Sequence, residues 1–130
     1  MKWVYNDGGR SNYFKANGVG DCVVRAIAIA SGHDYKEVYD YIFKIAKRSP
    51  RNGVDKKYSR IAAEHFGGVW TPIMSIGTGC KVHLCSEELP KGRLVCSCSA
   101  HYTAVVDGVI NDIYDPSRNG TRCVYGYYKF

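Results

Sequence analysis

The stretch "HYTAVVDGVINDIYD" constrains the fold more than any other part of this 130-residue sequence. Asp107 and Gly108 separate two Val-rich runs, and a two-residue turn of this composition is typical of a type I′ β-hairpin. Such a turn fixes the pairing of the strands, so Val106 faces Val109. The sequence therefore predicts two antiparallel strands in a defined register.

That register gathers polar side chains at the open end of the hairpin. Thr103 pairs with Asp112 and His101 pairs with Tyr114, and because side chains alternate along a strand, all four point to one face. His101 and Asp112 are diagonal neighbours, with Cβ atoms roughly 5–8 Å apart. A carboxylate at that distance can accept a hydrogen bond from an imidazole.

The segment "GDCVVRAIAIASG" predicts a helix that is apolar on nearly every side and therefore buried. Gly32 ends it. Cys22 lies at its start, where the helix dipole and free backbone N–H groups stabilise a thiolate. We expect Arg25, one turn later, to have a structural role in an ion pair with Asp21 or with a carboxylate of the sheet.

Two further helices are expected. Asp34 and Glu37 form a capping-box pattern before a second amphipathic segment, and Pro50 interrupts the chain after it. A third helix is predicted over residues 54–66. The other candidate strands are 69–74, with Pro72 suggesting an edge or a bulge, 80–85, 92–99 and 122–130.

This order of elements predicts an α+β fold, with an N-terminal cysteine helix and two further helices packed on a small antiparallel sheet. A chain of 130 residues is long enough for one domain with one core. We therefore expect a single domain over residues 1–130.

Composition bears on localisation and partners. No apolar run reaches the roughly 18 residues that span a bilayer, and "MKWVYNDGGR" lacks the apolar segment of a signal peptide. We expect a cytoplasmic protein with no membrane partner, whose six cysteines stay reduced. The net charge of +6 comes from dispersed Lys and Arg residues, so it does not predict a nucleic-acid partner.

A zinc site is the main alternative use of the cysteines. Cys80, His83, Cys85, Cys96 and Cys98 have suitable ligand types, but "CKVHLC" and "CSC" lack a CxxC knuckle. Cys96 and Cys98 lie two apart in a strand, where small apolar residues suit a core. We therefore expect no metal and no cofactor.

Cys22, His101 and Asp112 have the chain order of papain-like cysteine hydrolases: a cysteine, then a distant histidine, then an acidic residue or Asn. A histidine on a facing sheet can take the thiol proton. An aspartate behind it fixes the tautomer and stabilises the imidazolium. This constellation predicts nucleophilic catalysis, with core packing and metal binding as the other uses of Cys22.

Two longer segments, "GDCVVRAIAIASGHDYKEVYDYI" and "HYTAVVDGVINDIYDPSRNGTRCVYGYY", resemble a family of small phage-encoded proteins with a papain-like cysteine peptidase fold. The resemblance implies that fold and a triad of Cys22, His101 and Asp112, but no particular substrate. The "DC" pair is also similar to bacteriocin-processing peptidases, whose acidic residue sits in an Asp-Pro pair. Asp115, which precedes Pro116, therefore stays an alternative to Asp112, as does Asn111.

Papain-like enzymes usually place a Gln about six residues before the nucleophile, but position 16 is Ala16 here. Asn17 is the nearest amide side chain, and we expect it to form the oxyanion hole with the backbone N–H of Cys22. Tyr102 and Tyr114 are candidate substrate-binding residues beside the site.

The sequence thus predicts a cysteine hydrolase that acts on a peptide, an isopeptide or another amide through an acyl-enzyme. By the resemblance, it is phage-encoded and acts on a peptide or protein, with a host protein as one candidate, in the host cytoplasm. The alternative is a catalytically weak or inert papain-like protein that binds a host protein or nucleic acid. The missing Gln at position 16 favours that alternative.

Overall fold

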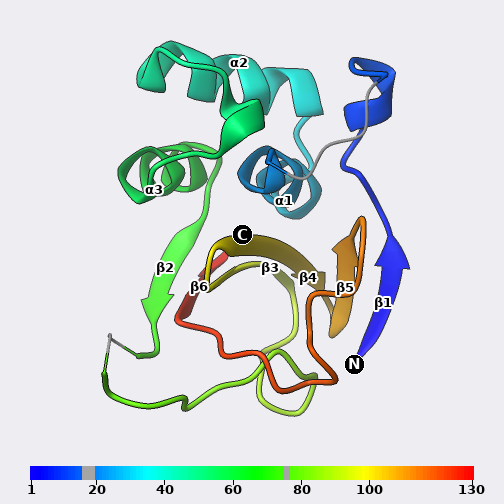
Figure 1. The fold of residues 1–130 in the computed structure, drawn as a ribbon, viewed down its shortest axis with the longest axis vertical. Helices are drawn as coiled ribbons and strands as arrows, with labels where there is room; N and C mark the ends of the chain where they lie inside the picture. Colours follow the sequence, from blue (N-terminus) through cyan, green and yellow to red (C-terminus); the bar gives the residue numbers. More distant parts are fainter. Residues whose placement is uncertain (16–19, 75–76) are drawn as a thin grey trace.

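The computed structural model describes residues 1–15, 20–74 and 77–130 (Figure 1). Within these ranges the fold is α+β, as predicted. The helices are α1 (Cys22–Ser31), α2 (Tyr35–Ala46) and α3 (Lys56–His65), with short 3-10 helices η1 (Arg10–Asn12) and η2 (Pro50–Asn52). The strands are β1 (Lys2–Tyr5), β2 (Val69–Pro72), β3 (Arg93–Cys98), β4 (His101–Val106), β5 (Val109–Asp112) and β6 (Gly126–Lys129). None of the described helices has the length and apolar character needed to cross a membrane.

The six strands form one sheet in the order β1-β5-β4-β3-β6-β2. The sheet is mixed, because β1 runs parallel to β5 and pairs Tyr5 with Asp112. The prediction of an antiparallel sheet is therefore wrong at this edge. All four residues of β1 are exposed, so the strand has no alternation of apolar and polar residues that could identify it. Pro72 ends β2 at the opposite edge of the sheet, as its missing N–H requires.

The hairpin has the predicted register. Val106 pairs with Val109 and Ala104 with Asn111. Asp107 and Gly108 both have positive φ angles, 48° and 79°, as a type I′ turn requires. The turn therefore sets the alignment of β4 and β5 that the site depends on.

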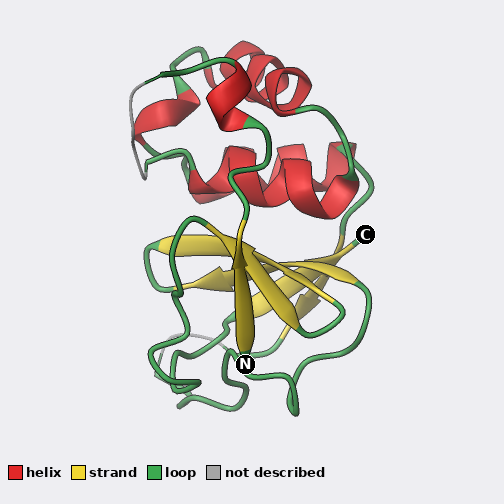
Figure 2. Ribbon diagram, turned by 90° about the vertical axis from the view of Figure 1, so that its right-hand side faces the viewer, coloured by secondary structure: helices red, strands yellow, loops and turns green. Residues whose placement is uncertain are grey.

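The helices cover one face of the sheet (Figure 2). α1 lies over its centre and is buried on nearly every side, as predicted, and it packs on Val95, Ala104 and Tyr128. Loops cover the other face, where Leu84, Leu89 and Val124 pack with apolar residues of the strands. α1 is thereby held between the sheet and the other two helices.

The helix ends differ from the predictions in detail. Gly32 ends α1 in the left-handed region, as expected. Asp34 caps α2 by accepting a hydrogen bond from the Lys36 N–H, 3.1 Å away. Glu37 does not complete a capping box, because its carboxylate lies 3.0 Å from Nδ1 of His33 instead. α3 begins at Lys56 after the N-cap residue Asp55, two residues later than expected.

Residues 80–85 form no strand, contrary to the prediction, and make only an isolated bridge between His83 and Cys123. The segment runs beside residues 122–124, which brings Cys80 and Cys123 together as a disulfide. The expectation that all six cysteines stay reduced is therefore wrong for this pair. The free cysteines are Cys22, Cys85, Cys96 and Cys98.

Candidate active site

Cys22 is the first residue of α1 and is half-buried. The preceding residue, Asp21, makes no side-chain cap to the helix. Its carboxylate is held instead by Arg10 at 2.9 Å, Arg25 at 2.9 Å and the Tyr35 hydroxyl at 2.6 Å. The side chain of Asp21 therefore leaves the first-turn N–H groups of α1 uncapped beside the Cys22 thiol.

His101 and Asp112 form a close buried pair. Nε2 of His101 lies 2.8 Å from Oδ2 of Asp112, and the two residues are only 6% and 2% exposed. Thr103 donates its hydroxyl to the same carboxylate oxygen at 2.7 Å, and the Ile113 N–H donates to the other at 2.7 Å. With Nε2 engaged, Nδ1 is the ring nitrogen left for the thiol.

The strand register explains how the pair forms. His101 and Thr103 share a face of β4 with Val105, and Asp112 shares a face of β5 with Ile110. Val105 and Ile110 belong to the core on the side of the sheet away from the helices. His101 meets Cys22 because it is the first residue of β4, at the end of the sheet where α1 begins.

Arg25 links the helix to the sheet. Its Nε lies 2.9 Å from Asp21 and its Nη1 lies 2.8 Å from Asp112, with the three side chains almost fully buried. The predicted ion pair with Asp21 or a sheet carboxylate is confirmed, since both form. Cys22 is thus fixed relative to Asp112 by a buried charge bridge that starts one turn along its own helix.

The electrostatics favour a thiolate–imidazolium pair. Burial alone raises the pKa of Cys22, but hydrogen bonds from His101 and the Tyr102 backbone, with the nearby Arg25 charge, lower that pKa below its usual range. Burial alone lowers the pKa of His101, but its bonds to Asp112 and Cys22 raise it overall. Both shifts stabilise a deprotonated sulfur beside a protonated ring.

Asp112 stays ionised in this setting. Burial raises the pKa of its carboxyl, but hydrogen bonds from His101 and Thr103 and the charge of His101 bring that pKa below its ordinary value. A permanent negative charge behind the imidazole stabilises its protonated form. Asp112 is therefore placed to orient His101 and to hold its positive charge.

The two alternatives to Asp112 lie elsewhere. The amide of Asn111 accepts from Asn6 at 3.1 Å and donates to the Val109 carbonyl at 3.0 Å. The carboxylate of Asp115 accepts from the Ser117 N–H at 2.9 Å. These contacts give both side chains local structural roles, and Asp112 is the acidic residue hydrogen-bonded to His101.

Of the remaining predicted site residues, Tyr114 and Tyr102 lie beside the candidate site, while the position of Asn17 is not described. Tyr114 lies against the imidazole, with ring centroids 5.2 Å apart, and lines a pocket with Cys22. Tyr102 packs against the helical core and lines a smaller pocket beside Cys22. Asn17 lies outside the described residues, so its predicted place in the oxyanion hole stays a prediction.

Cys22 and His101 open onto two pockets. One, of about 560 Å³, is lined by η2 residues and Tyr114. The other, of about 220 Å³, is lined by Val54, Lys56 and Tyr102. Ala100, at the turn between β3 and β4, lines both of them. The Cys22 thiol therefore lies between two pockets. This arrangement would let a substrate extend on both sides of the bond that the thiol attacks.

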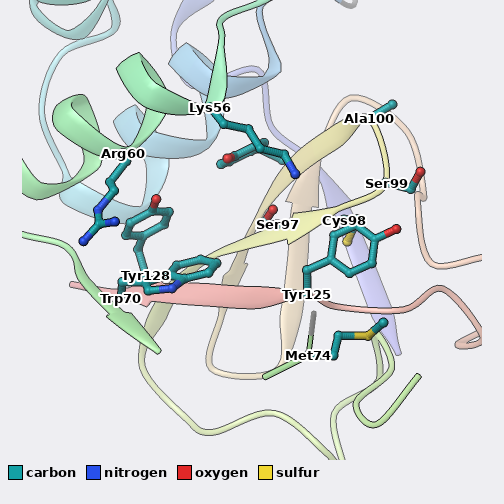
Figure 3. A pocket seen from close by; sticks show the side chains of 11 residues that line it. Lys56, Arg60, Trp70, Met74, Ser97, Cys98, Ser99, Ala100, Tyr125 and Tyr128 are labelled. Carbon is teal, nitrogen blue, oxygen red and sulfur yellow. The ribbon is translucent and has the colours of Figure 1, made fainter. Parts of the chain in front are cut away.

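A third pocket, of about 740 Å³, continues from the smaller one, because Lys56, Cys98, Ala100 and Tyr102 line both (Figure 3). Trp70 and Tyr128 form its aromatic side, with ring centroids 4.7 Å apart. Lys56 extends into it from α3, and its Nζ lies 5.8 Å from the centre of the Tyr125 ring. The pocket can take a side chain that combines an apolar body with a polar or anionic tip.

Sequence reasoning missed the contribution of the segment around η2. The Gly53 N–H donates to the Gly20 carbonyl at 2.8 Å, which ties the start of α1 to this turn. A Cβ on Gly20 would lie 2.2 Å from the Arg51 carbonyl oxygen, so only glycine fits there. The glycine directly before "DC" was the available signal, and it marks a close backbone approach.

Comparison with known proteins found no matching family model, no matching curated protein and no matching solved structure.

Proposed function

We propose that the protein is a papain-like cysteine hydrolase that cleaves a peptide, isopeptide or other amide through an acyl-enzyme. The observation that carries the proposal is the convergence of Cys22, His101 and Asp112 at one end of the sheet, with Nε2 of His101 2.8 Å from Asp112. A helix N-terminus and a protonated imidazole together lower the pKa of the thiol, which is the requirement for a cysteine nucleophile at neutral pH.

The chemical steps follow from the positions of the groups. The Cys22 thiolate attacks the carbonyl carbon of the amide and forms a tetrahedral intermediate. Protonated His101 then delivers its proton to the leaving amine as the C–N bond breaks, which leaves an acyl group on the sulfur. His101 next takes a proton from water, whose oxygen attacks the thioester and releases the acid, which regenerates the Cys22 thiolate beside a protonated His101.

The start of α1 supplies groups that can stabilise the tetrahedral intermediate. The N–H groups of the first helical turn carry a partial positive charge, and the Asp21 side chain does not cap them. The backbone N–H of Cys22 is one oxyanion donor in this mechanism. A second donor from Asn17 remains part of the proposal.

The pockets suggest how the substrate lies. A chain that passes Cys22 extends toward Tyr114 and η2 on one side and toward Lys56 and Trp70 on the other. A peptide or protein segment suits this continuous path better than a small isolated amide. The resemblance to small phage proteins supports a host protein in the host cytoplasm as the target.

The first test measures alkylation of Cys22 by iodoacetamide against pH, with site-resolved mass spectrometry. Cys85 is an internal control, because its hydrogen bond to Glu88 raises the pKa of its thiol while that of Cys22 is lowered. Each unit of pKa separation gives about a tenfold difference in thiolate fraction at mildly acidic pH. We expect Cys22 to be modified first, and His101→Ala to raise its apparent pKa.

Asp115→Asn is the matched control for Asp112→Asn, because Asp115 accepts from the local Ser117 backbone while His101 is bonded to Asp112. We expect only the Asp112 variant to move the Cys22 profile. Equal profiles for Cys22 and Cys85, unchanged in His101→Ala, would remove the chemical basis of the proposal.

Activity is tested with a mixed peptide library read by mass spectrometry, with Cys22→Ala as the inactive control. We expect cleavage that depends on Cys22 and, under denaturing quench, a peptide acyl group on that sulfur. A reactive Cys22 that forms no acyl-enzyme with any library member or with host-cell lysate proteins would instead favour the inert binding protein.

A further inference from the structure

A second cluster of chemically reactive side chains lies where residues 80–85 run beside residues 122–124. The ligand atoms of Cys80, His83 and Cys123 all lie within 4.8 Å of one another. The backbone holds them there, because His83 and Cys123 form a β-bridge and the Leu84 N–H donates to the Arg122 carbonyl at 2.8 Å. Two sulfurs and an imidazole in this arrangement match the ligand types of a zinc site.

The histidine of the cluster is also oriented as a metal ligand would be. Nδ1 of His83 lies 3.0 Å from Oε2 of Glu88, which also accepts from the His83 N–H at 3.0 Å. Histidines that bind zinc usually donate their other ring N–H to a carboxylate, which fixes the tautomer and the direction of the free nitrogen. With Nδ1 engaged, Nε2 of His83 is the nitrogen left for a metal.

We propose that Cys80, His83 and Cys123 form a zinc site in the reduced protein and that the Cys80–Cys123 disulfide is its oxidised, metal-free state. The fourth tetrahedral position belongs to water, since Cys80 is exposed and the other two ligands are only partly buried. This proposal does not depend on the hydrolase mechanism, because it uses none of the residues around Cys22.

The interconversion balances with a cellular thiol as the reductant. Two molecules of a glutathione-type thiol reduce the disulfide, and the thiol is itself oxidised to its own disulfide. Zn²⁺ then replaces the protons of the Cys80 and Cys123 thiols and accepts the lone pair of neutral His83, so two protons are released. Oxidation by a disulfide of the same class reverses both steps and frees the metal.

The site differs from the zinc alternative considered from the sequence. Cys96 and Cys98 are buried in the core on the face of the sheet away from the helices and are not part of the cluster. Cys123, which lies 43 positions from Cys80, takes their place. Pairing of the two loop segments, which no local motif signals, is what brings these ligands together.

The test compares reduced and oxidised protein for zinc binding. The protein is reduced with a monothiol, and the thiol is then removed under anaerobic conditions. Zn²⁺ is added as the only metal ion. Bound metal is counted by mass spectrometry, and affinity is measured by competition with a chromophoric chelator. Co²⁺ replaces Zn²⁺ in a parallel sample to report thiolate ligation by its absorption. We expect one metal per reduced chain and none per oxidised chain.

Single substitutions test which residues bind the metal ion. Cys80→Ser and Cys123→Ser should each lose the cobalt–thiolate absorption in part and bind zinc far more weakly. Glu88→Gln should weaken zinc binding about 10–100-fold by releasing Nδ1 of His83. Glu87→Gln is the matched control, an exposed neighbour, and should change nothing.

Reduced wild-type protein that binds no zinc would overturn the proposal. Zinc retained at full affinity in both cysteine variants would overturn it as well, since the metal would then lie elsewhere. Alkylation of Cys22, measured on the same samples, reports separately on the candidate active site, so failure of one proposal is distinguishable from failure of the other.

Discussion

At the scale of single residues, Asp112 has more contacts than its position in the sequence suggests. Its two oxygens accept from His101, Thr103, Arg25 and the Ile113 backbone. An aspartate so placed cannot relax toward solvent when a proton moves on the imidazole. Its contribution to stability and its contribution to the reactivity of Cys22 should therefore change together.

Asp112→Asn should lower the free energy of unfolding at pH 7 by about 3–5 kcal/mol, because it breaks a buried ion pair and removes one of the two carboxylates, Asp21 and Asp112, that balance the Arg25 charge. The pKa of Asp112 is lowered in the folded state, so its stabilisation is present above the unfolded pKa and is lost as pH falls through the folded pKa. Urea unfolding at pH 7 and at about pH 3 measures this. The two proteins should converge at the acid end, and a constant difference would contradict the assignment.

Thr103→Val removes one hydroxyl and keeps the shape of the side chain. We expect a loss of about 1–3 kcal/mol, because the lost hydrogen bond goes to a charged group in a buried site. Thr71→Val, on the exposed edge strand β2, is the control and should change stability little. Equal urea midpoints for the Thr103 variant and wild type would show that the Thr103 bond contributes nothing.

The pH dependence expected for the proposed amide hydrolysis follows from the shifted pKa values of Cys22 and His101. The rate should rise as pH passes the lowered pKa of Cys22 and fall as pH passes the raised pKa of His101, which gives a bell-shaped profile. A profile that keeps rising to the ordinary thiol pKa would mean that Cys22 works without a protonated partner. Initial rates on one cleaved library peptide measure this.

At the scale of elements, the turn at Asp107 and Gly108 aligns the strands that carry His101 and Asp112. Gly108→Ala places a Cβ at a φ of 79° and should cost about 1–2 kcal/mol. Asp107→Asn is the milder control, since Asn tolerates the left-handed region. Thermal unfolding measures both. An unchanged Cys22 alkylation profile in the folded Gly108 variant would show that pairing along the strands, and not the turn alone, holds the register.

Sequence reasoning worked best where one local pattern decides the outcome. The hairpin register, the burial of α1 and the position of Gly32 all follow from spacing and turn chemistry. Sequence reasoning failed where contacts between distant segments determine the structure. β1 gains its place only by pairing with β5, and Cys80 finds Cys123 only through the bridge between two loops. No sequence pattern near β1 indicates its pairing with β5, and none near Cys80 indicates its pairing with Cys123.

In the candidate site, too, local patterns could be predicted and contacts between distant segments could not. The diagonal contact of His101 with Asp112 could be read from a two-residue turn. A structural ion pair of Arg25 could be predicted from the sequence. Its bridge between Asp21 and Asp112 could not, because that bridge depends on how α1 packs on the sheet. The pocket around Lys56 and Trp70 depends on where α3 and β2 sit, which periodicity does not determine.

At the scale of the whole molecule, the Cys80–Cys123 disulfide joins the loops that cover the face of the sheet opposite the helices. Closing a loop with a sequence separation of 43 stabilises a folded chain by about 2–4 kcal/mol. Cys80→Ser should therefore lower the unfolding free energy of the oxidised protein by that amount. Cys85→Ser, which breaks no disulfide, is the control for denaturant unfolding. A Cys80 variant as stable as wild type would show that the disulfide adds nothing.

The buried bridge from Arg25 to Asp112 spans 87 positions of the chain. During synthesis the helix that carries Cys22 leaves the ribosome long before the strand that carries Asp112 has been made. The Cys22 thiol of a growing chain therefore lacks both His101 and Asp112 until β4 and β5 have been made. In a nascent chain, the thiolate that the proposed reaction requires is therefore not stabilised by these groups until β4 and β5 have emerged.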